Sequence, residues 1–463
     1  MIALLYNRQS KWFVERKSAV SENITPIVAI IGAGPAGLYA AKQLVADGCQ
    51  VVIFNRDIKP GGLAEYGIYP DKHRMKEGLR AQFRSILSSP MVSYAGNVCV
   101  GNDGDVTLEE LRDMGFHAIL ATVGAQGDKQ LGIPGEDVQG VYHAKEVVYH
   151  YNRLPPYSRR ELKIGKRVAI VGVGNVMLDI ARWLMDEKRV DVVMAVARRG
   201  PAEVKFDRHE LEMVVSLVDM QDLTEQIKLA APVMQAVGQD PQDALTIYSD
   251  AMPHAGQHDT PSRLTIRFLS SPRRILTNGQ GGVRGLEVEA TTLVQQGDAV
   301  KAAGTGVLHT LDVDTVIFAI GDTVDTNLGL PMDGNQFVKN PHSRFLVEGE
   351  SYESCASAQG EQPCGVFVAG WARKASTGVV GVARRDGTRA ADAIRLFLTS
   401  GVKLKNVTLA EICRKISQRL PDSINYPQIA KLEEFERLKA SELGVEEFKF
   451  DTNEEMLCLM NAK

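Results

Sequence analysis

The sequence predicts an α/β fold with two domains, each built on a parallel β-sheet. Near residue 32 an apolar segment runs into a glycine turn and then into a helix, and the same arrangement recurs near residue 172. The chain also contains 42 glycines among 463 residues, whereas average usage gives about 32. Aromatic residues make up only 6%. A large chain rich in glycine and poor in aromatic residues is typical of nucleotide-binding α/β proteins.

The overall composition excludes several other classes of protein. Hydrophobic residues make up 44% of the chain and charged residues 24%, which is ordinary for a globular protein. The 53 basic and 57 acidic residues give a formal net charge of −4, so no basic field predicts a nucleic-acid partner. No apolar run reaches the roughly 18 residues of a membrane-spanning helix.

The cysteines and the first residues predict a cytoplasmic protein without a metal site. No C-x-x-C occurs, so neither a redox dithiol nor a local iron–sulfur or zinc site is predicted. Scattered cysteines are typical of small buried residues in a reducing compartment. The first 17 residues hold only a short apolar run and include Glu15, which argues against a secretory signal and mildly against a transit peptide.

The first glycine turn lies within residues 26–41, where a continuous apolar run predicts a buried parallel strand. Gly32 allows the turn, and Gly34 lets backbone N–H groups approach a pyrophosphate. Gly37 lets the following helix pack closely on the strand. Because strand, turn, helix and second strand follow in order, a Rossmann-like nucleotide site is predicted here.

The second glycine turn lies within residues 167–182 and has Gly172 and Gly174 at the first two positions. Met177 takes the third position, so helix and strand must pack less closely there. The two turns are too far apart for one βαβ unit of about 30 residues, so two dinucleotide sites are predicted. Without a nucleophile or metal motif, two such sites suggest hydride transfer between a nicotinamide and a second dinucleotide, for which flavin is the natural carrier.

The residues that follow the second strand of each domain indicate the nucleotide. The strand over residues 49–54 ends at Asn55 in place of the usual acidic residue, and an amide can also hydrogen-bond a ribose. The strand over residues 190–197 ends in Arg198 and Arg199. Arginines suit a 2′-phosphate, which favours NADP(H) over NAD(H); the alternative is a solvated arginine pair that caps the strand.

Five sequence patterns taken together and in order resemble one protein family. They are GGL at residues 61–63, IPGED at 133–137, GxGNVxLDxAR at 172–182, RRGP at 198–201 and GWxxxxxTGV at 370–379. The combination resembles the adrenodoxin reductase-like ferredoxin–NADP reductases and, more distantly, the small subunit of bacterial glutamate synthase. The resemblance runs from about residue 26 almost to the end of the chain.

The resemblance implies that the first turn binds FAD, that the second binds NADP(H), and that residues 370–379 pass the isoalloxazine ring. A helix that begins after Val379 would direct N–H dipoles toward the flavin's pyrimidine side. The residues expected at the FAD site are Gly32, Gly34, Pro35, Ala36, Gly37, Asn55, Gly62, Leu63, Gly67, Thr122, Gly124, Gly370, Trp371, Thr377, Gly378 and Val379. Those expected at the NADP site are Gly172, Gly174, Asn175, Val176, Arg198, Arg199 and Glu210.

The function that the resemblance implies is that of an FAD-containing NADPH:ferredoxin oxidoreductase. Hydride would pass from nicotinamide C4 to flavin N5, and single electrons would then pass to ferredoxin or another small iron–sulfur protein. Positioning and electrostatics suffice for this chemistry, so no side chain is assigned as catalytic. Two alternatives stay open. One is an electron-input subunit for a larger redox partner subunit, like the glutamate synthase small subunit; the other is a flavin- or nucleotide-binding regulatory protein without turnover.

The sequence departs from the family pattern in ways that concern the acceptor. Residues 70–73 read Pro-Asp-Lys-His where the family commonly has Pro-Asp-His, and the helical stretch 229–236 is nearly uncharged where adrenodoxin reductase carries basic acceptor-binding residues. The family's glutamate synthase relatives also carry an amino-terminal cysteine cluster that is missing here. A basic set could bind an acidic acceptor or simply form a solvated helix face: Lys72, His73, Arg74, Lys76 and Arg80.

The order of the motifs predicts an NADP domain inserted into a discontinuous FAD domain. We expect an N-terminal extension over residues 1–23, FAD-domain segments over 24–124 and 322–463, and the NADP domain over 125–321. The acidic end of the chain is expected to be a solvated helical tail; the alternative is a segment that docks a partner.

Overall fold

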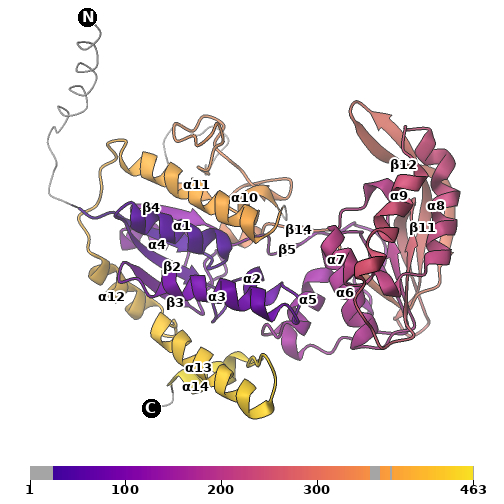
Figure 1. Cartoon of the computed structure of the whole chain (residues 1–463). Helices are drawn as coiled ribbons and strands as arrows, with labels where there is room; N and C mark the ends of the chain where they lie inside the picture. Colours follow the sequence, from indigo (N-terminus) through magenta and orange to yellow (C-terminus); the bar gives the residue numbers. More distant parts are fainter. Residues whose placement is uncertain (1–23, 355–364, 376–377, 462–463) are drawn as a thin grey trace, which may run out of the picture. The chain divides into compact units, whose positions relative to one another are not determined.

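The structure is a computed structural model that describes residues 24–354, 365–375 and 378–461. Within these residues the chain forms two compact units, each assembled from segments that are distant in sequence (Figure 1). Unit 1 consists of residues 24–62, Gly78–Ala125 and 324–431. Unit 2 consists of Leu63–Glu77, Gln126–Thr323 and 432–461.

Unit 1 is built on a five-stranded sheet in which every strand pair is parallel. The strands are buried, as their apolar sequences require. Strand β1 lies between β2 and β4, so later strands are added on both sides of it. This reversal of the strand order is the switch point where such sheets bind ligands. The order across the sheet is β17 (Val366–Val368), β4 (Ala118–Ala121), β1 (Ile27–Ile31), β2 (Gln50–Asn55) and β3 (Val92–Gly96).

The principal helix pair of unit 1 comes from two segments that are far apart in the sequence. Helix α1 (Pro35–Ala46) follows the first glycine turn, and α11 (Val380–Leu398) follows the last flavin-type segment. The two helices pack against each other and lie side by side in Figure 1. The unit also contains α4 (Leu108–Met114), α10 (Trp371–Lys374), α12 (Leu409–Arg419), a 3₁₀ turn (Thr326–Leu328), β15 (Met332–Asp333) and β16 (Gln336–Phe337). Helices α3 (His73–Leu87) and α13 (Tyr426–Leu443) each span a boundary between the units.

Unit 2 repeats the parallel arrangement around the second glycine turn. Strand β7 lies between β8 and β13, which gives a second switch point. The order across this sheet is β6 (Val141–His143), β13 (Thr315–Phe318), β7 (Arg167–Val171), β8 (Val192–Val196) and β9 (Arg263–Arg267). The helices of the unit are α2 (Leu63–Tyr66), α5 (Ala144–Tyr151), α6 (Asn175–Asp186), α7 (Arg208–Glu212), α8 (Met220–Gln235), α9 (Pro241–Ser249) and α14 (Asn453–Asn461).

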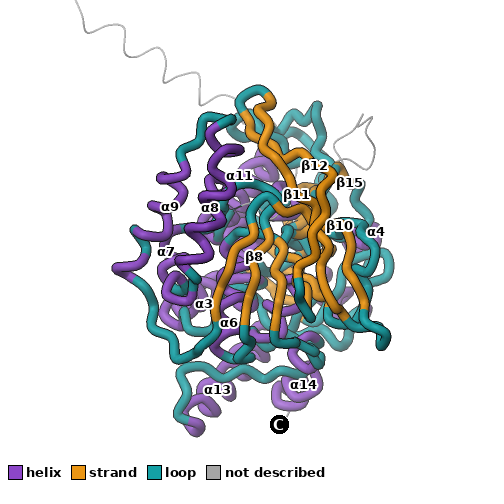
Figure 2. Tube along the Cα trace, turned by 90° about the vertical axis from the view of Figure 1, so that its right-hand side faces the viewer, coloured by secondary structure: helices purple, strands orange, loops and turns teal. Residues whose placement is uncertain are grey.

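Unit 2 also carries an antiparallel sheet. Strands β10 (Ser270–Thr277), β11 (Val283–Gln296) and β12 (Ala299–Leu311) pair in that order and are seen as adjacent orange strands in Figure 2. Two short strands, β5 (Gly127–Asp128) and β14 (Asp322–Thr323), pair where the chain enters and leaves the unit. The prediction of an α/β fold with two Rossmann-like sheets is confirmed.

The acidic end of the chain is partly buried, and the expectation of a solvated tail is wrong for one segment. Between α13 and α14, Lys449 is only 5% exposed. Its ammonium lies 3.1 Å from the carboxylate of buried Glu65 and donates to the Glu65 carbonyl at 2.8 Å. A buried charge needs such a partner, and the sequence gives no sign of one so far away in the chain. Among the described residues, no helix is long and apolar enough to cross a membrane.

Candidate dinucleotide sites

The first glycine turn has the geometry that its sequence predicts. Gly32 has a φ of 103°, and a Cβ there would lie 2.5 Å from the carbonyl oxygen of Thr122. A Cβ on Gly34 would meet nothing within 4 Å, so this position faces open space. A Cβ on Gly37 would lie 2.2 Å from the Gly32 carbonyl oxygen. The turn therefore requires glycine at two positions and leaves the third accessible to a ligand.

Two polar side chains stabilise this turn from within. The Asn55 amide oxygen accepts from the Ala33 N–H at 2.9 Å, and its NH₂ group donates to the carbonyls of Asp57 and Lys59. The Thr122 hydroxyl lies 2.8 Å from the Gly32 carbonyl and 3.0 Å from that of Ile31. Asn55 thus shapes the turn, a role that the sequence analysis did not assign to it; ribose binding by Asn55 stays a prediction.

Further glycines surround the start of α1. A Cβ on Gly62 would lie 3.2 Å from the Gly34 Cα, and one on Gly370 would lie 2.8 Å from the Ala36 Cβ. Gly387 of α11 is closer still, since its Cβ would lie 2.0 Å from the Ala36 carbonyl oxygen. The structure thereby brings Gly62 and Gly370 to the first turn. Gly387 was missed, because a single glycine within a helix carries no recognisable motif.

The second glycine turn shares the first two positions of this geometry. Gly172 has a φ of 127°, and its Cβ would lie 2.2 Å from the Ala319 carbonyl oxygen. A Cβ on Gly174 would meet nothing within 4 Å. Met177 at the third position is fully buried and packs in the core of unit 2. A long apolar side chain therefore fills the space that the first turn closes with backbone contact.

Of the predicted NADP-site residues after the second turn, one is hydrogen-bonded within the protein and the others have exposed or unpaired side chains. Asn175 donates to the Asp207 carboxylate and accepts from the Asp207 N–H, both at 2.7 Å. Val176 is 45% exposed. Arg198 is exposed and Arg199 half-buried, and neither guanidinium has an ion pair or hydrogen bond to any residue that the structure describes. Two unpaired guanidinium groups at the end of β8 can bind an anionic ligand group.

The helices that the sequence places at the pyrophosphates and at the flavin are α1, α6 and α11. Each of them begins with neither a side-chain cap nor an acidic residue in its first turn. By contrast, α4, α5, α8, α9 and α12 each have a side chain that caps the first turn. Unsatisfied N–H groups together with the helix dipole favour an anion at an uncapped N-terminus. With the open glycine positions, the donors present fit a dinucleotide pyrophosphate at both α1 and α6.

The remaining predicted FAD residues lie in both units. Pro35 and Ala36 are the first residues of α1, and Gly124 has a φ of 71° after β4. In unit 2, Leu63 begins α2, and its carbonyl accepts the Gly67 N–H at 2.9 Å. In the last segment, the Trp371 indole N–H donates to the Gly378 carbonyl at 3.3 Å, and Val379 is 66% exposed. Thr377 lies outside the described residues.

Glu210 lies in a cluster of charged residues close to α6. The Lys72 ammonium is 2.6 Å and 2.7 Å from its two carboxylate oxygens. Asp179 of α6 lies in the field of this pair, and burial raises its pKa to about 7, with Lys72 lowering and Glu210 raising it. Asp179 belongs to the GxGNVxLDxAR pattern, but the pattern alone does not predict this raised pKa.

The basic residues over positions 72–80 do not form one exposed surface for an acidic acceptor. Lys76 is 1% exposed; its ammonium donates to the Asn152 side chain at 3.2 Å and lies 3.5 Å from Glu447. The His73 ring lies 3.1 Å from Glu446, and Lys72 is paired with Glu210 as described above. Buried or internally paired cations cannot serve an acidic partner well. Arg74 remains exposed.

One group of side chains outside the turns has metal-ligand character. Ligand atoms of Asp128, His143 and Asp322 lie within 4.8 Å of one another, beside the β5–β14 pair. The ammonium of Lys145 is 2.7 Å from the Asp128 carboxylate. Because this cation already balances the carboxylate, we assign the group to joining these strands rather than to binding a metal.

Comparison with known proteins identifies the family of this chain. Residues 26–222 match the model of the pyridine nucleotide-disulphide oxidoreductase family. The NADPH:adrenodoxin oxidoreductase of Arabidopsis thaliana is 30% identical over 406 residues, which cover 80% of this chain and 82% of the relative. This chain belongs to the adrenodoxin reductase-like family. The NADPH-ferredoxin reductase FprA of Mycobacterium leprae is 28% identical and covers 79% of this chain, with 83% of its own length matched.

Solved structures of the family agree in fold. FprA of Mycobacterium tuberculosis in complex with NADPH superimposes with a TM-score of 0.79 at 24% identity, over 95% of this chain and all of that one. The resemblance stated from the motifs is confirmed, and the family is one of NADPH-dependent flavoprotein oxidoreductases.

Proposed function

We propose that this protein is an FAD-containing NADPH:ferredoxin oxidoreductase. The observation that carries the proposal is a pair of glycine turns, each followed by a helix without a side-chain cap. Only in unit 2 does the next strand end at unpaired arginines, Arg198 and Arg199. The first turn fits a dinucleotide without a 2′-phosphate, and the second fits one that carries a 2′-phosphate. The names of the relatives, which act on adrenodoxin or ferredoxin with NADPH, support the same function.

In this proposal the residues of the chain bind and orient both dinucleotides. The N–H groups at the start of α1 bind the pyrophosphate of FAD, and those at the start of α6 bind that of NADPH. Arg198 and Arg199 bind the 2′-phosphate. Trp371 and Gly378, which a hydrogen bond joins, would contact the isoalloxazine ring, as the family resemblance implies. When bound, FAD accepts a hydride and releases single electrons, chemistry that needs no acid or base from the protein.

The proposed acceptor is ferredoxin or another small iron–sulfur protein. The uncharged stretch 229–236, largely in α8, does not provide the basic surface that adrenodoxin reductase uses, and Lys76 is buried. Arg74 therefore replaces the earlier set as the residue to test. Charge reversal, Arg74→Glu, should weaken ferredoxin reduction by a few-fold at low salt and leave dye reduction by NADPH unchanged. Equal ferredoxin kinetics in both forms would exclude this surface.

One anaerobic titration tests the function as a whole. NADPH should bleach the flavin absorbance of the purified protein at far lower concentration than NADH, and oxidised ferredoxin should then restore the colour. A yellow protein that NADPH does not bleach would support a regulatory role. Co-purification of a large partner that accepts the electrons would support the electron-input subunit.

We propose the cytoplasm as the compartment. Cys49, Cys99, Cys413 and Cys458 are free thiols in the part of the chain that the structure describes, as expected in a reducing compartment. Several relatives are named as mitochondrial, so fractionation of cells that express the tagged chain is the deciding measurement.

A further inference from the structure

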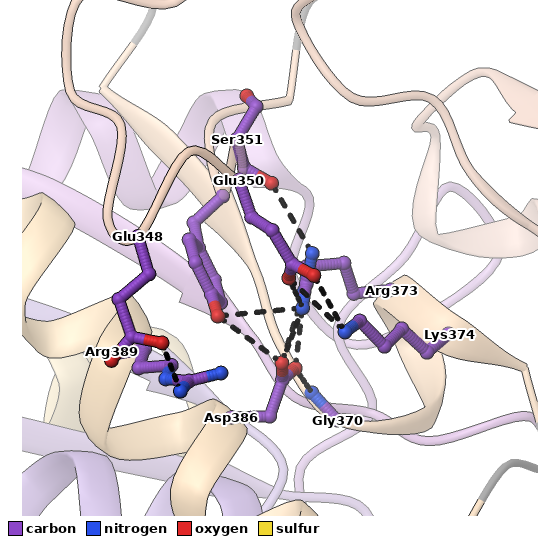
Figure 3. A network of polar contacts seen from close by, with 9 residues as sticks. Glu348, Glu350, Ser351, Gly370, Arg373, Lys374, Asp386 and Arg389 are labelled. Carbon is purple, nitrogen blue, oxygen red and sulfur yellow. Dashed lines mark hydrogen bonds and ion pairs between the residues drawn. The ribbon is translucent and has the colours of Figure 1, made fainter.

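Arg373 and Asp386 form a buried ion pair in unit 1 (Figure 3). Arg373 is 2% exposed, and its guanidinium reaches the Asp386 carboxylate with one contact of 2.5 Å and two of 3.2 Å. The guanidinium also lies over the Tyr352 ring, 4.1 Å from its centroid. Taking two charges out of water is costly, and only close, multiple contacts compensate for it. The pair therefore needs a reason beyond general stability.

The carboxylate of Asp386 also holds the backbone next to the first glycine turn. Its second oxygen accepts from the Gly370 N–H at 2.7 Å. Gly370 has φ 67° and ψ −145°, a conformation that only glycine adopts readily, and it packs against Ala36 at the start of α1. Trp371 follows immediately. Asp386 thus fixes the peptide that leads from the sheet into the segment assigned to the flavin.

Charges of opposite sign balance within this cluster. Glu350 receives the Arg373 guanidinium at 2.6 Å and the Lys374 ammonium at 3.1 Å, which gives two cations and two anions with Asp386. Burial alone would lower the pKa of Arg373, but hydrogen bonds and the charge of Asp386 raise it. The hydrogen bond from Arg373 in turn lowers the pKa of Glu350. Removal of either the Arg373 guanidinium or the Asp386 carboxylate therefore leaves its partner unbalanced beside Gly370.

We propose that Asp386 and Arg373 are positioning residues for the flavin. Asp386 holds the Gly370 peptide, and Arg373 prevents this carboxylate from placing an unbalanced negative charge beside the ring. The inference rests on the proposed function, which places FAD at the first turn. Reduction adds negative charge to a flavin, so a lone carboxylate nearby opposes reduction and a lone cation favours it.

The test compares the midpoint potential of bound flavin in full-length holoprotein variants by spectroelectrochemistry. Arg373→Met leaves the carboxylate unbalanced and should shift the potential to more negative values. Asp386→Asn leaves the guanidinium unbalanced and should shift it to more positive values. The double variant should return close to the wild-type potential. A merely structural role would not produce shifts of opposite sign that cancel.

A second readout, the fraction of chains that retain FAD, tests the backbone contact. Asp386→Asn keeps an oxygen that accepts from the Gly370 N–H and should retain FAD, whereas Asp386→Ala should lose most of it. Arg395→Met is the matched control, because Arg395 lies on the same helix and its ion pairs, with Asp47 and Asp392, do not involve the cluster. This control should match wild type in both potential and FAD content.

The possible outcomes separate the inference from the function on which it rests. Single variants that bind FAD with unshifted potentials, or with shifts in the same direction, would overturn the inference. If Arg373→Met alone fails to fold, Asp386→Asn and the double variant still decide the matter, since the first must shift the potential and the second must restore it. A wild-type protein without FAD would instead overturn the proposed function.

Discussion

The two glycine turns begin alike and then diverge. Gly32 and Gly172 both have a positive φ, and both pack against a carbonyl of the adjoining strand. At the third position the first turn has Gly37 in backbone contact, whereas the second has the buried side chain of Met177. Glycines of three other segments pack around the start of α1, whereas in unit 2 strand β8 is followed by two unpaired arginines. Under the proposed function, this difference suits a resident cofactor at the closed first turn and a ligand that leaves after each turnover at the open second turn.

The largest expected effect follows from the backbone contact at Gly37. Gly37→Ala would place a Cβ 2.2 Å from the Gly32 carbonyl oxygen and 2.5 Å from the Thr122 hydroxyl. Overpacking of this kind costs about 1–3 kcal/mol or more where backbone cannot move. We expect colourless protein with a lowered melting temperature, measured by absorbance and calorimetry.

A helix glycine in open space is the control for this substitution. A Cβ on Gly78 of α3 would meet nothing within 4 Å, so Gly78→Ala should bind FAD normally and be slightly more stable. A yellow, stable Gly37→Ala protein would show that the first turn is not closed by backbone contact.

The next effect concerns the arginines of the second turn. Arg198→Ala and Arg199→Ala each remove charge-assisted hydrogen bonds worth about 1.5–3 kcal/mol, which corresponds to roughly 10- to 100-fold in the KM for NADPH. The KM for NADH should change little, because NADH lacks the 2′-phosphate. Arg263→Ala is the control, since Arg263 is paired with Asp219 at the opposite end of the strands. Equal effects on both nucleotides would remove the 2′-phosphate assignment.

A smaller effect is expected where the two turns agree. Gly34→Ala and Gly174→Ala each add a methyl group that meets no protein atom within 4 Å, and neither glycine has a positive φ. Stability should stay within about 0.5 kcal/mol of wild type. The methyl group would nevertheless occupy space needed by a pyrophosphate. Gly34→Ala should weaken FAD retention alone, and Gly174→Ala should raise the KM for NADPH and NADH equally; a fall in stability without these losses would contradict the assignment.

The last expected effect is a pH dependence of stability at the second turn. Asp179 of α6 has a pKa raised by burial to about 7 from an ordinary value of 3.8. Between these values the folded protein keeps a proton that the unfolded chain has released, so the free energy of unfolding should fall as pH rises through this window. Asp179→Asn should flatten this part of the stability curve in denaturant titrations. An unchanged slope would show that Asp179 is already ionised at neutral pH.

The sequence predicts the turns and strands well because their information is local. Glycines at fixed spacing after an apolar run specify Gly32 and Gly172, and an arginine pair after a strand stands out at Arg198 and Arg199. Contacts between distant segments are not local and could not be predicted. Gly387 packs on Ala36 from a segment that is distant in the sequence. Lys76 is expected from the sequence to be a surface cation, but it is buried in an ion pair with Glu447.

Strand β17 has a consequence for the order in which the molecule forms during synthesis. It is the edge strand of the sheet in unit 1, yet it lies at Val366–Val368, and α11 follows only at Val380–Leu398. The two larger sheets of unit 2 are complete by Phe318. Because synthesis proceeds from the N-terminus, all strands of the two larger sheets in unit 2 leave the ribosome before the last strand of the unit 1 sheet. The first glycine turn must wait for Gly370 and Gly387, so FAD capture should be among the last steps of biosynthesis.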